Sequence, residues 1–213
     1  MTKVGVLRFP GTNCDRDVFS WVEARGFEAE YLWHLDLFEE KKYDLLVVPG
    51  GFSYGDYLRS GALAALSPAM KSLRRFASAG GPVLGICNGF QILCESHLLP
   101  GALVKNEGRR FVDDWSELEV VNENSKFGAQ FKKGQHLKLP IAHGDGRFYA
   151  PADELKKIYD QNQVWLRYVN NHNGSLGGIA GIMNEKKNVA ALMPHPERAI
   201  YPWMGGQDGW GFL

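Results

Sequence analysis

The chain has 213 residues, with 24 lysines and arginines against 24 aspartates and glutamates and therefore a formal net charge of zero at neutral pH. A neutral chain lacks the cationic excess that binding to nucleic-acid backbones or anionic membranes requires, so these two classes of protein are disfavoured. Hydrophobic residues make up 45% and aromatic residues 12%, which is ordinary globular usage and excludes a disordered chain. We expect one compact domain spanning residues 1–213.

The sequence also predicts the compartment. No apolar run approaches the roughly 20 residues that a membrane-spanning helix needs, and the first residues show no secretory signal pattern. The three cysteines, Cys14, Cys87 and Cys94, are an odd number and form no C-x-x-C pair. We therefore expect a soluble protein of the reducing cytoplasm.

The first half of the chain alternates apolar, β-branched runs with amphipathic stretches. We predict strands at 4–9, 28–32, 44–48 and 82–86, and helices at 15–25, 68–79 and 90–96. Thr12 or Asn13 is expected to cap the first helix, and Gly26 to end it. This βαβα order implies an α/β fold with an open, mostly parallel sheet and helices on both faces.

The second half has a different pattern, in which most elements are strands separated by polar or glycine turns. We predict strands at 111–122, 137–143, 164–168, 179–183 and 189–193, and one helix at 153–159. The last two strands are close enough to form a hairpin. These strands are either antiparallel additions to the sheet or a small lobe on its edge.

The sharpest local signal is the sequence Gly-Ile-Cys-Asn-Gly at residues 85–89, at a strand end with a helix expected to follow. It has the form G-x-C-x-G, the thiol counterpart of the nucleophile elbow G-x-S-x-G. The glycines avoid Cβ collisions in a strained turn, and the free N–H groups of a helix N-terminus stabilise a thiolate. The N–H of Asn88 is positioned to donate to an oxyanion. A buried structural cysteine between two glycines is the alternative.

A thiolate needs a base, and His195 is the best candidate among the six histidines. It lies in Pro-His-Pro-Glu at residues 194–197, directly after an apolar run, and the prolines end the strand there. Glu197 is within reach of the second ring nitrogen and would fix the tautomer, as in a nucleophile, base and orienter triad. A loop histidine beside a solvated glutamate is the alternative.

A third element is the glycine-rich loop at residues 49–56, which follows the strand predicted at 44–48. Glycines there allow the backbone to approach a ligand, so Gly51 is expected to supply a second oxyanion donor. Ligands of open α/β sheets bind outside these strand ends. The loop lacks the phosphate-binding pattern G-x-x-x-x-G-K-[ST], so we exclude a phosphate cradle.

Other candidates are weaker. Cys94 and His97 are only two possible ligands, so we predict no metal site and interpret them as a core thiol and a helix-end histidine. Cys14 is interpreted as an ordinary loop cysteine. The polar turn at 143–147 follows a predicted strand and is expected to border the same cleft.

In combination, residues 85–91 and 194–197 resemble the nucleophile elbow and the His-Glu pair of class I (triad) glutamine amidotransferases. Stretches at 8–17, 50–59, 142–148 and 193–198 are similar to one branch of that family, the glutaminase subunits of phosphoribosylformylglycinamidine synthase. The resemblance runs from Val4 to the C-terminus and implies the flavodoxin-like amidotransferase fold. Two departures are His172, where proline is usual, and Asp145, where glutamate is usual.

The resemblance implies a function and a set of roles. Cys87 would attack the side-chain amide of glutamine, with Gly51 and Asn88 holding the oxyanion, His195 oriented by Glu197, and Gln91 lining the pocket. The ammonia would pass to an ATP-using synthetase subunit that makes formylglycinamidine ribonucleotide in purine biosynthesis.

The resemblance also implies partners. No cofactor is expected in this chain, because ATP and magnesium would bind the synthetase subunit. A small accessory subunit is a further candidate partner. The competing hypotheses are a cysteine peptidase or DJ-1-like hydrolase on a similar sheet, and a non-catalytic binding subunit.

Overall fold

The computed structural model describes all 213 residues. Nine strands form one sheet in the order β2-β1-β3-β4-β11-β10-β9-β6-β7. Their bounds are β1 (Lys3–Arg8), β2 (Glu28–Trp33), β3 (Leu45–Val48), β4 (Val83–Ile86), β6 (Val112–Val120), β7 (His136–His143), β9 (Val164–Tyr168), β10 (Ile179–Met183) and β11 (Val189–Leu192). The pairs from β2 to β11 are parallel, and those from β11 to β7 are antiparallel. The predicted α/β class with antiparallel strands added in the second half is confirmed.

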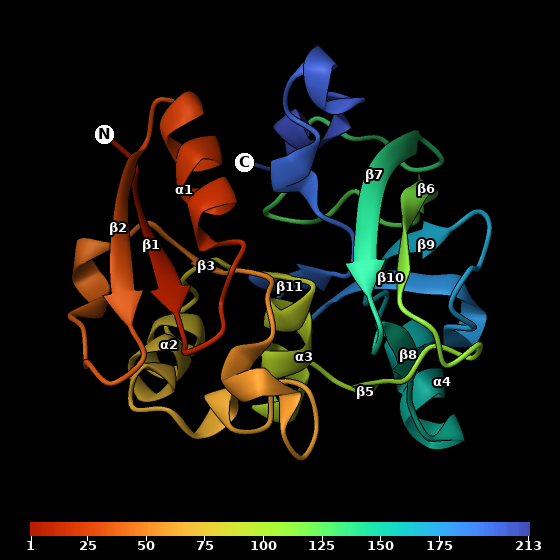
Figure 1. Cartoon of the computed structure of the whole chain (residues 1–213), viewed down its shortest axis with the longest axis horizontal. Coiled ribbons are helices and arrows are strands. Elements are labelled where there is room, and N and C mark those ends of the chain that lie inside the picture. Colours follow the sequence, from red (N-terminus) through yellow and green to blue (C-terminus); the bar gives the residue numbers. More distant parts are fainter.

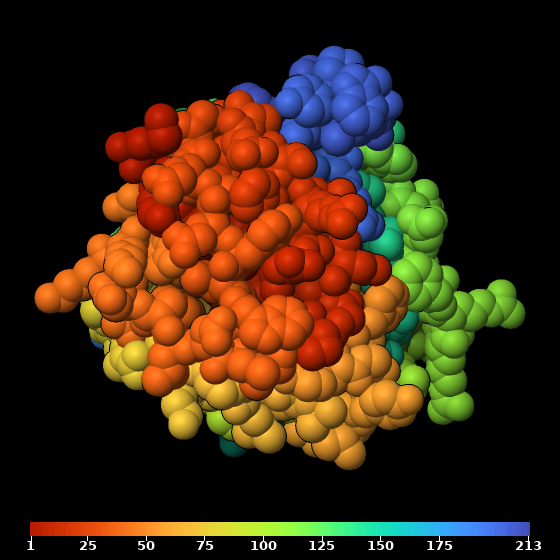
Figure 2. Space-filling view, turned by 60° about the vertical axis from the view of Figure 1, so that its left-hand side comes forward, coloured from red at the N-terminus to blue at the C-terminus, as the bar shows by residue number.

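Helices cover both faces of the parallel half. They are α1 (Asp15–Ala24), α2 (Ala69–Ser78) and α3 (Asn88–Glu95), and a fourth helix, α4 (Ala152–Asp160), lies near the antiparallel half (Figure 1). In Figure 1, α1 and the C-terminal segment lie above the central strands, and α2, α3 and α4 lie below them. Figure 2 turns the N-terminal part of the chain toward the viewer, and the C-terminal segment projects at its upper edge. None of these helices has the length and apolar content that crossing a bilayer would require.

The two alternatives for the second half are now decided, because its long strands continue the main sheet. β10 and β11 form the predicted antiparallel hairpin, and β9, β6 and β7 extend the sheet beyond them. The sequence prediction missed a separate two-stranded sheet of β5 (Ala102–Val104) and β8 (Arg147–Tyr149). Three-residue strands are too short to show a period of two.

The start of α1 at Asp15 is as predicted, but the cap predicted for it and the start predicted for α3 were wrong. Neither Thr12 nor Asn13 caps α1: the hydroxyl of Thr12 accepts from the N–H of Phe9 at 2.9 Å, and Asn13 Oδ1 accepts from the thiol of Cys14 at 3.3 Å. The helix predicted at 90–96 begins earlier, at Asn88, because the elbow leads into the helix without an intervening loop. Gly26 follows the end of α1 with φ +75°, as predicted.

The topology determines where the functional loops meet. β3, β4 and β11 are adjacent parallel strands, with Val48 beside Gly85 and Leu192 beside Ile86. Their carboxyl-terminal ends therefore lie side by side, on the side of the sheet where ligands of open α/β folds bind. A single core of 54 buried hydrophobic residues packs around the sheet and holds these ends in register.

Candidate active site

The turn after β4 has the strained geometry that an elbow requires. Cys87 has φ +50° and ψ −106°, a conformation that costs a non-glycine residue free energy. A Cβ on Gly89 would lie 1.9 Å from the carbonyl oxygen of Val48, and one on Gly85 would lie 2.6 Å from Leu93. The collision at Gly89 is with backbone, so only glycine fits there, while a Cβ on Gly85 would force the Leu93 side chain to move. Helix α3 starts directly after the thiol.

The loop after β11 brings His195 to the same point. His195 Nδ1 lies 2.6 Å from Glu197 Oε1, and each residue is only 1% exposed. A Cβ on Gly50 would be 2.8 Å from His195 Cε1 and 3.3 Å from Cys87 Cβ, so the histidine and the cysteine lie side by side. The other ring nitrogen, Nε2, has no hydrogen-bond partner within the chain.

The electrostatics favour a protonated imidazole. Burial opposes the charge on His195, but the Glu197 carboxylate and then the Cys87 thiol outweigh it and raise the pKa of His195 well above its usual range. An imidazolium next to a sulfur stabilises the thiolate form of that sulfur.

The backbone N–H groups of Gly51 and Asn88 lie on the two neighbouring strand ends. Neither donates a hydrogen bond to another group of the chain, so both remain available to an external acceptor. Gly51 has φ +148°, and a Cβ there would be 2.8 Å from the backbone of the first loop at Gly11, Thr12 and Asn13. The first loop thus holds the glycine loop in place.

A cavity of about 270 Å³ opens over the thiol. Gly51, Cys87, Gln91 and the turn at 143–145 line it, so this turn borders the cleft as expected. Gln91 is 5% exposed, and its amide is held between Asn88 Nδ2, which donates to it at 2.7 Å, and the carbonyl of Asp145, to which it donates at 2.7 Å.

Two carboxyl groups also face this cavity. Asp56 ends the glycine loop, and Asp145 accepts from the hydroxyl of Ser60 at 2.9 Å. Burial and then the charge of Asp145 raise the pKa of Asp56 to about 6. Asp145, one of the two departures from the family pattern, is therefore a wall residue of the cavity, whereas His172 lines a separate cavity with Trp115.

Cys14 lies against the His195–Glu197 pair, a position that the sequence did not predict. It is 3% exposed, and its sulfur lies within 4.8 Å of a ring nitrogen of His195 and a carboxylate oxygen of Glu197. The interpretation as an ordinary loop cysteine did not predict this contact, which arises because the loop after β1 also reaches the carboxyl ends of the parallel strands. A thiol at the end of the strand adjacent to β3 was the only available signal.

Cys94 and His97 do not form a site. Cys94 is buried and its thiol donates to the carbonyl of Pro100 at 3.5 Å, and His97 lies just beyond the end of α3. A larger cavity of about 750 Å³ near α2 and α4 includes His97, but it is lined neither by Cys87 nor by the His195–Glu197 pair.

Comparison with known proteins agrees with this geometry. The model of the CobB/CobQ-like glutamine amidotransferase domain matches residues 1–207. The structure of PurLQS from Thermotoga maritima is 44% identical, with a TM-score of 0.91, and the match covers 99% of this chain and 94% of that one.

More distant structures share the fold. A glutamine amidotransferase from Thermotoga maritima is 20% identical with a TM-score of 0.63, over 93% of this chain and 77% of that one. A protein from Thermoplasma acidophilum that is described as a GMP synthase subunit is 16% identical with a TM-score of 0.62, over 92% and 85%. The chain therefore belongs to the CobB/CobQ-like glutamine amidotransferase family, and it is a glutamine amidotransferase rather than a peptidase or a DJ-1-like hydrolase.

Proposed function

We propose that this chain is the glutaminase subunit of phosphoribosylformylglycinamidine synthase. The observation that carries the chemistry is the meeting of Cys87 with the buried His195–Glu197 pair at neighbouring strand ends. The specific assignment is supported by the 44% identity to PurLQS over nearly the whole chain. It is also supported by the stretches at 8–17 and 50–59. The second contains most of the glycine loop, and the first pairs with it through the bridge between Thr12 and Gly51.

In the first half of the reaction, the sulfur of Cys87 attacks the side-chain amide carbon of glutamine. The carbonyl electron pair moves to oxygen, where the N–H groups of Gly51 and Asn88 donate to it. His195 then gives its proton to the amide nitrogen, the C–N bond breaks, and ammonia leaves. The product is a thioester on Cys87 with a neutral imidazole beside it.

In the second half, His195 takes a proton from water, and the resulting hydroxide attacks the thioester carbon. The same two N–H groups hold the second oxyanion. When the C–S bond breaks, glutamate is released and Cys87 regains its thiolate next to a protonated His195. Glu197 keeps the ring in one tautomer throughout, because its Oε1 accepts from Nδ1 at 2.6 Å.

The ammonia would be used by a synthetase subunit that converts formylglycinamide ribonucleotide to formylglycinamidine ribonucleotide. We assign ATP and magnesium to that subunit, because this chain has no phosphate-binding loop and no net positive charge. A small accessory subunit is a further candidate member of the complex. The isolated chain is expected to have low glutaminase activity, since ammonia released without an acceptor is wasted.

The test is Cys87→Ala in the assembled complex, with Cys94→Ala as a control thiol outside the cavity. Glutamine-dependent synthesis is expected to fall to background, while synthesis from added ammonium chloride stays within twofold of wild type. Equal loss of both activities would refute a role limited to ammonia supply. Peptide cleavage without glutamate formation would refute the amidotransferase mechanism itself.

A further inference from the structure

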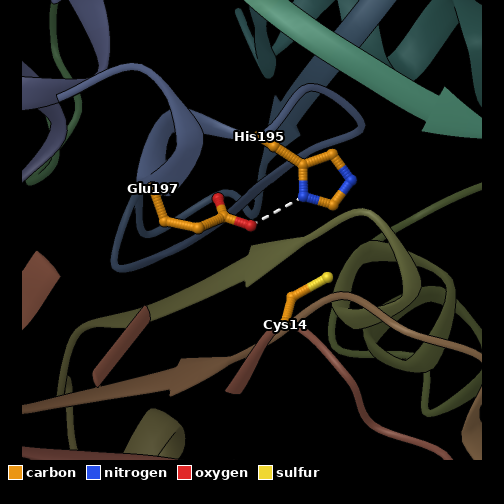
Figure 3. A group of neighbouring side chains, drawn as sticks. All are labelled: Cys14, His195 and Glu197. Atoms are coloured by element: carbon orange, nitrogen blue, oxygen red, sulfur yellow. Dashed lines mark hydrogen bonds and ion pairs between the residues drawn. The ribbon is translucent and has the colours of Figure 1, made fainter. Parts of the chain in front are cut away.

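A second buried thiol lies against the triad. Figure 3 shows the sulfur of Cys14 pointing toward the ring of His195, beside the carboxylate of Glu197 that is hydrogen-bonded to the same ring. The point where a Cβ on Gly50 would lie is 3.0 Å from Cys14 Sγ and 2.8 Å from His195 Cε1. Glycine at position 50 therefore lets the sulfur and the imidazole both pack closely against the backbone, where a Cβ would collide with them.

Cys14 is also held by hydrogen bonds to residues other than the histidine. Arg198 Nη2 donates to its sulfur at 3.1 Å, and the thiol donates to Asn13 Oδ1 at 3.3 Å. Its backbone N–H donates to the carbonyl of Gly50 at 3.2 Å. Arg198 is itself fixed by Asp17, to which its Nε donates at 3.0 Å.

Two buried polar atoms next to this thiol have no partner within the chain. They are His195 Nε2 and Glu197 Oε2, and both residues are 1% exposed. In the proposed mechanism Nε2 exchanges a proton with the substrate. The ring must therefore keep an orientation in which Nε2 faces the substrate. The hydrogen bond from Nδ1 to Glu197 restrains the ring at one atom, and the Cys14 sulfur, within 4.8 Å of a ring nitrogen, packs against it as well.

The chemistry of the residue suits this position. Burial raises the pKa of the Cys14 thiol and outweighs the opposing effect of the neighbouring His195. A sulfur is also large and polarizable, so it packs closely against a ring edge.

We propose that Cys14 is a positioning residue of the triad, whose sulfur, anchored by Arg198, packs against the His195 ring and keeps Nε2 directed toward Cys87. This inference rests on the proposed function, since it assumes that His195 is the acid and base. It assigns to Cys14 no contact with glutamine and no covalent step.

The test compares Cys14→Ala and Cys14→Ser in the assembled complex. Cys14→Ala is expected to lower the glutamine-dependent kcat on the order of 10- to 100-fold, the usual cost of small misplacement of a catalytic group, with KM within about twofold. Cys14→Ser, which keeps a hydrogen-bonding group for Arg198, is expected to restore kcat to within about threefold of wild type. Ammonia-dependent synthesis should not change.

A second readout separates positioning from general destabilisation. The pH dependence of Cys87 alkylation by iodoacetamide, followed by mass spectrometry of the Cys87 peptide, reports the contact between the thiol and the imidazole. In Cys14→Ala, the pH at which the alkylation rate is half-maximal is expected to differ from the wild-type value. In Cys94→Ala, this pH is expected to equal the wild-type value. Cys14→Val, which fills the space but cannot accept from Arg198, covers the case in which the alanine variant does not fold, and it too should lower kcat.

The inference is overturned if Cys14→Ala, or Cys14→Val in its place, keeps the wild-type kcat and alkylation profile. It is also overturned if Cys14→Ser has a kcat as low as that of Cys14→Ala while the pH profile of Cys87 alkylation in both variants matches wild type. Either result leaves the proposed function intact, because that function depends on Cys87→Ala. Retention of glutamine-dependent synthesis in Cys87→Ala would instead contradict the proposed function itself.

Discussion

The backbone N–H of Cys87 donates to the carbonyl of Leu192 at 2.8 Å. This bond joins the candidate nucleophile to the last residue of β11, three positions before His195. The strained elbow and the loop of the candidate base are therefore connected through one rung of the parallel sheet. A disturbance of either strand end moves both groups, which makes the site sensitive to substitutions that never touch the substrate.

Glu197→Gln should reduce turnover far more than substrate binding. The amide is uncharged, so it no longer offsets the burial that disfavours a protonated His195, and its NH₂ can select the wrong tautomer. We expect the glutamine-dependent kcat to fall at least about 100-fold, with KM little changed and ammonia-dependent synthesis retained. Steady-state kinetics of the complex test this, with exposed Glu185→Gln as control. A kcat above half that of wild type would contradict the assigned role of Glu197.

Gly89→Ala should damage both stability and activity, for a steric reason. The new Cβ would lie 1.9 Å from the carbonyl oxygen of Val48, and backbone atoms of β3 cannot move aside cheaply. We expect a loss of roughly 1–3 kcal/mol, seen as a Tm lower by several degrees in thermal unfolding, together with loss of glutaminase activity. The matched control is Gly108→Ala, where a Cβ meets nothing within 4 Å. If Gly89→Ala had the Tm and activity of this control, the elbow would not require glycine.

His143 should make the fold sensitive to acid. The side chain is 3% exposed, and burial together with the charge of His195 lowers the pKa of His143 to about 4. An unfolded histidine titrates near 6.5, so below that pH the unfolded chain binds the proton first. The stabilising effect of the neutral ring is complete above about 6.5 and is lost as the pH falls toward about 4.

Urea unfolding at pH 7 and pH 4 measures this effect. Between these values the free energy of unfolding should fall by about 3 kcal/mol more in wild type than in His143→Gln. The carboxyl groups titrate in both proteins, so their effects cancel in the difference. Exposed His136→Gln is the control and should follow wild type. The same loss in wild type and His143→Gln would show that His143 is not the titrating group.

Short-range patterns were sufficient to predict the position of the elbow after β4. The spacing Gly-x-Cys-x-Gly, the rigid Pro-His-Pro-Glu and the glycine pair after β3 are each contained within a few residues. Their physical basis is equally local, since it consists of Cβ collisions, absent N–H groups and helix N-termini. The same holds for most strand and helix positions, which follow from hydrophobic periods of two and 3.6.

What only the tertiary structure decided is which of these local features touch. Cys14 and Arg198 are separated by 184 positions, yet their side chains meet at 3.1 Å. No period or motif encodes that contact, because it depends on the order in which β1, β3, β4 and β11 line up. The sequence also did not determine whether β10, β9, β6 and β7 continue the main sheet. Strands with alternating apolar and polar residues bury one face equally well in a separate lobe or in an extended sheet. Pairing between strands distant in sequence resolved it, and such pairing is a property of the packed chain.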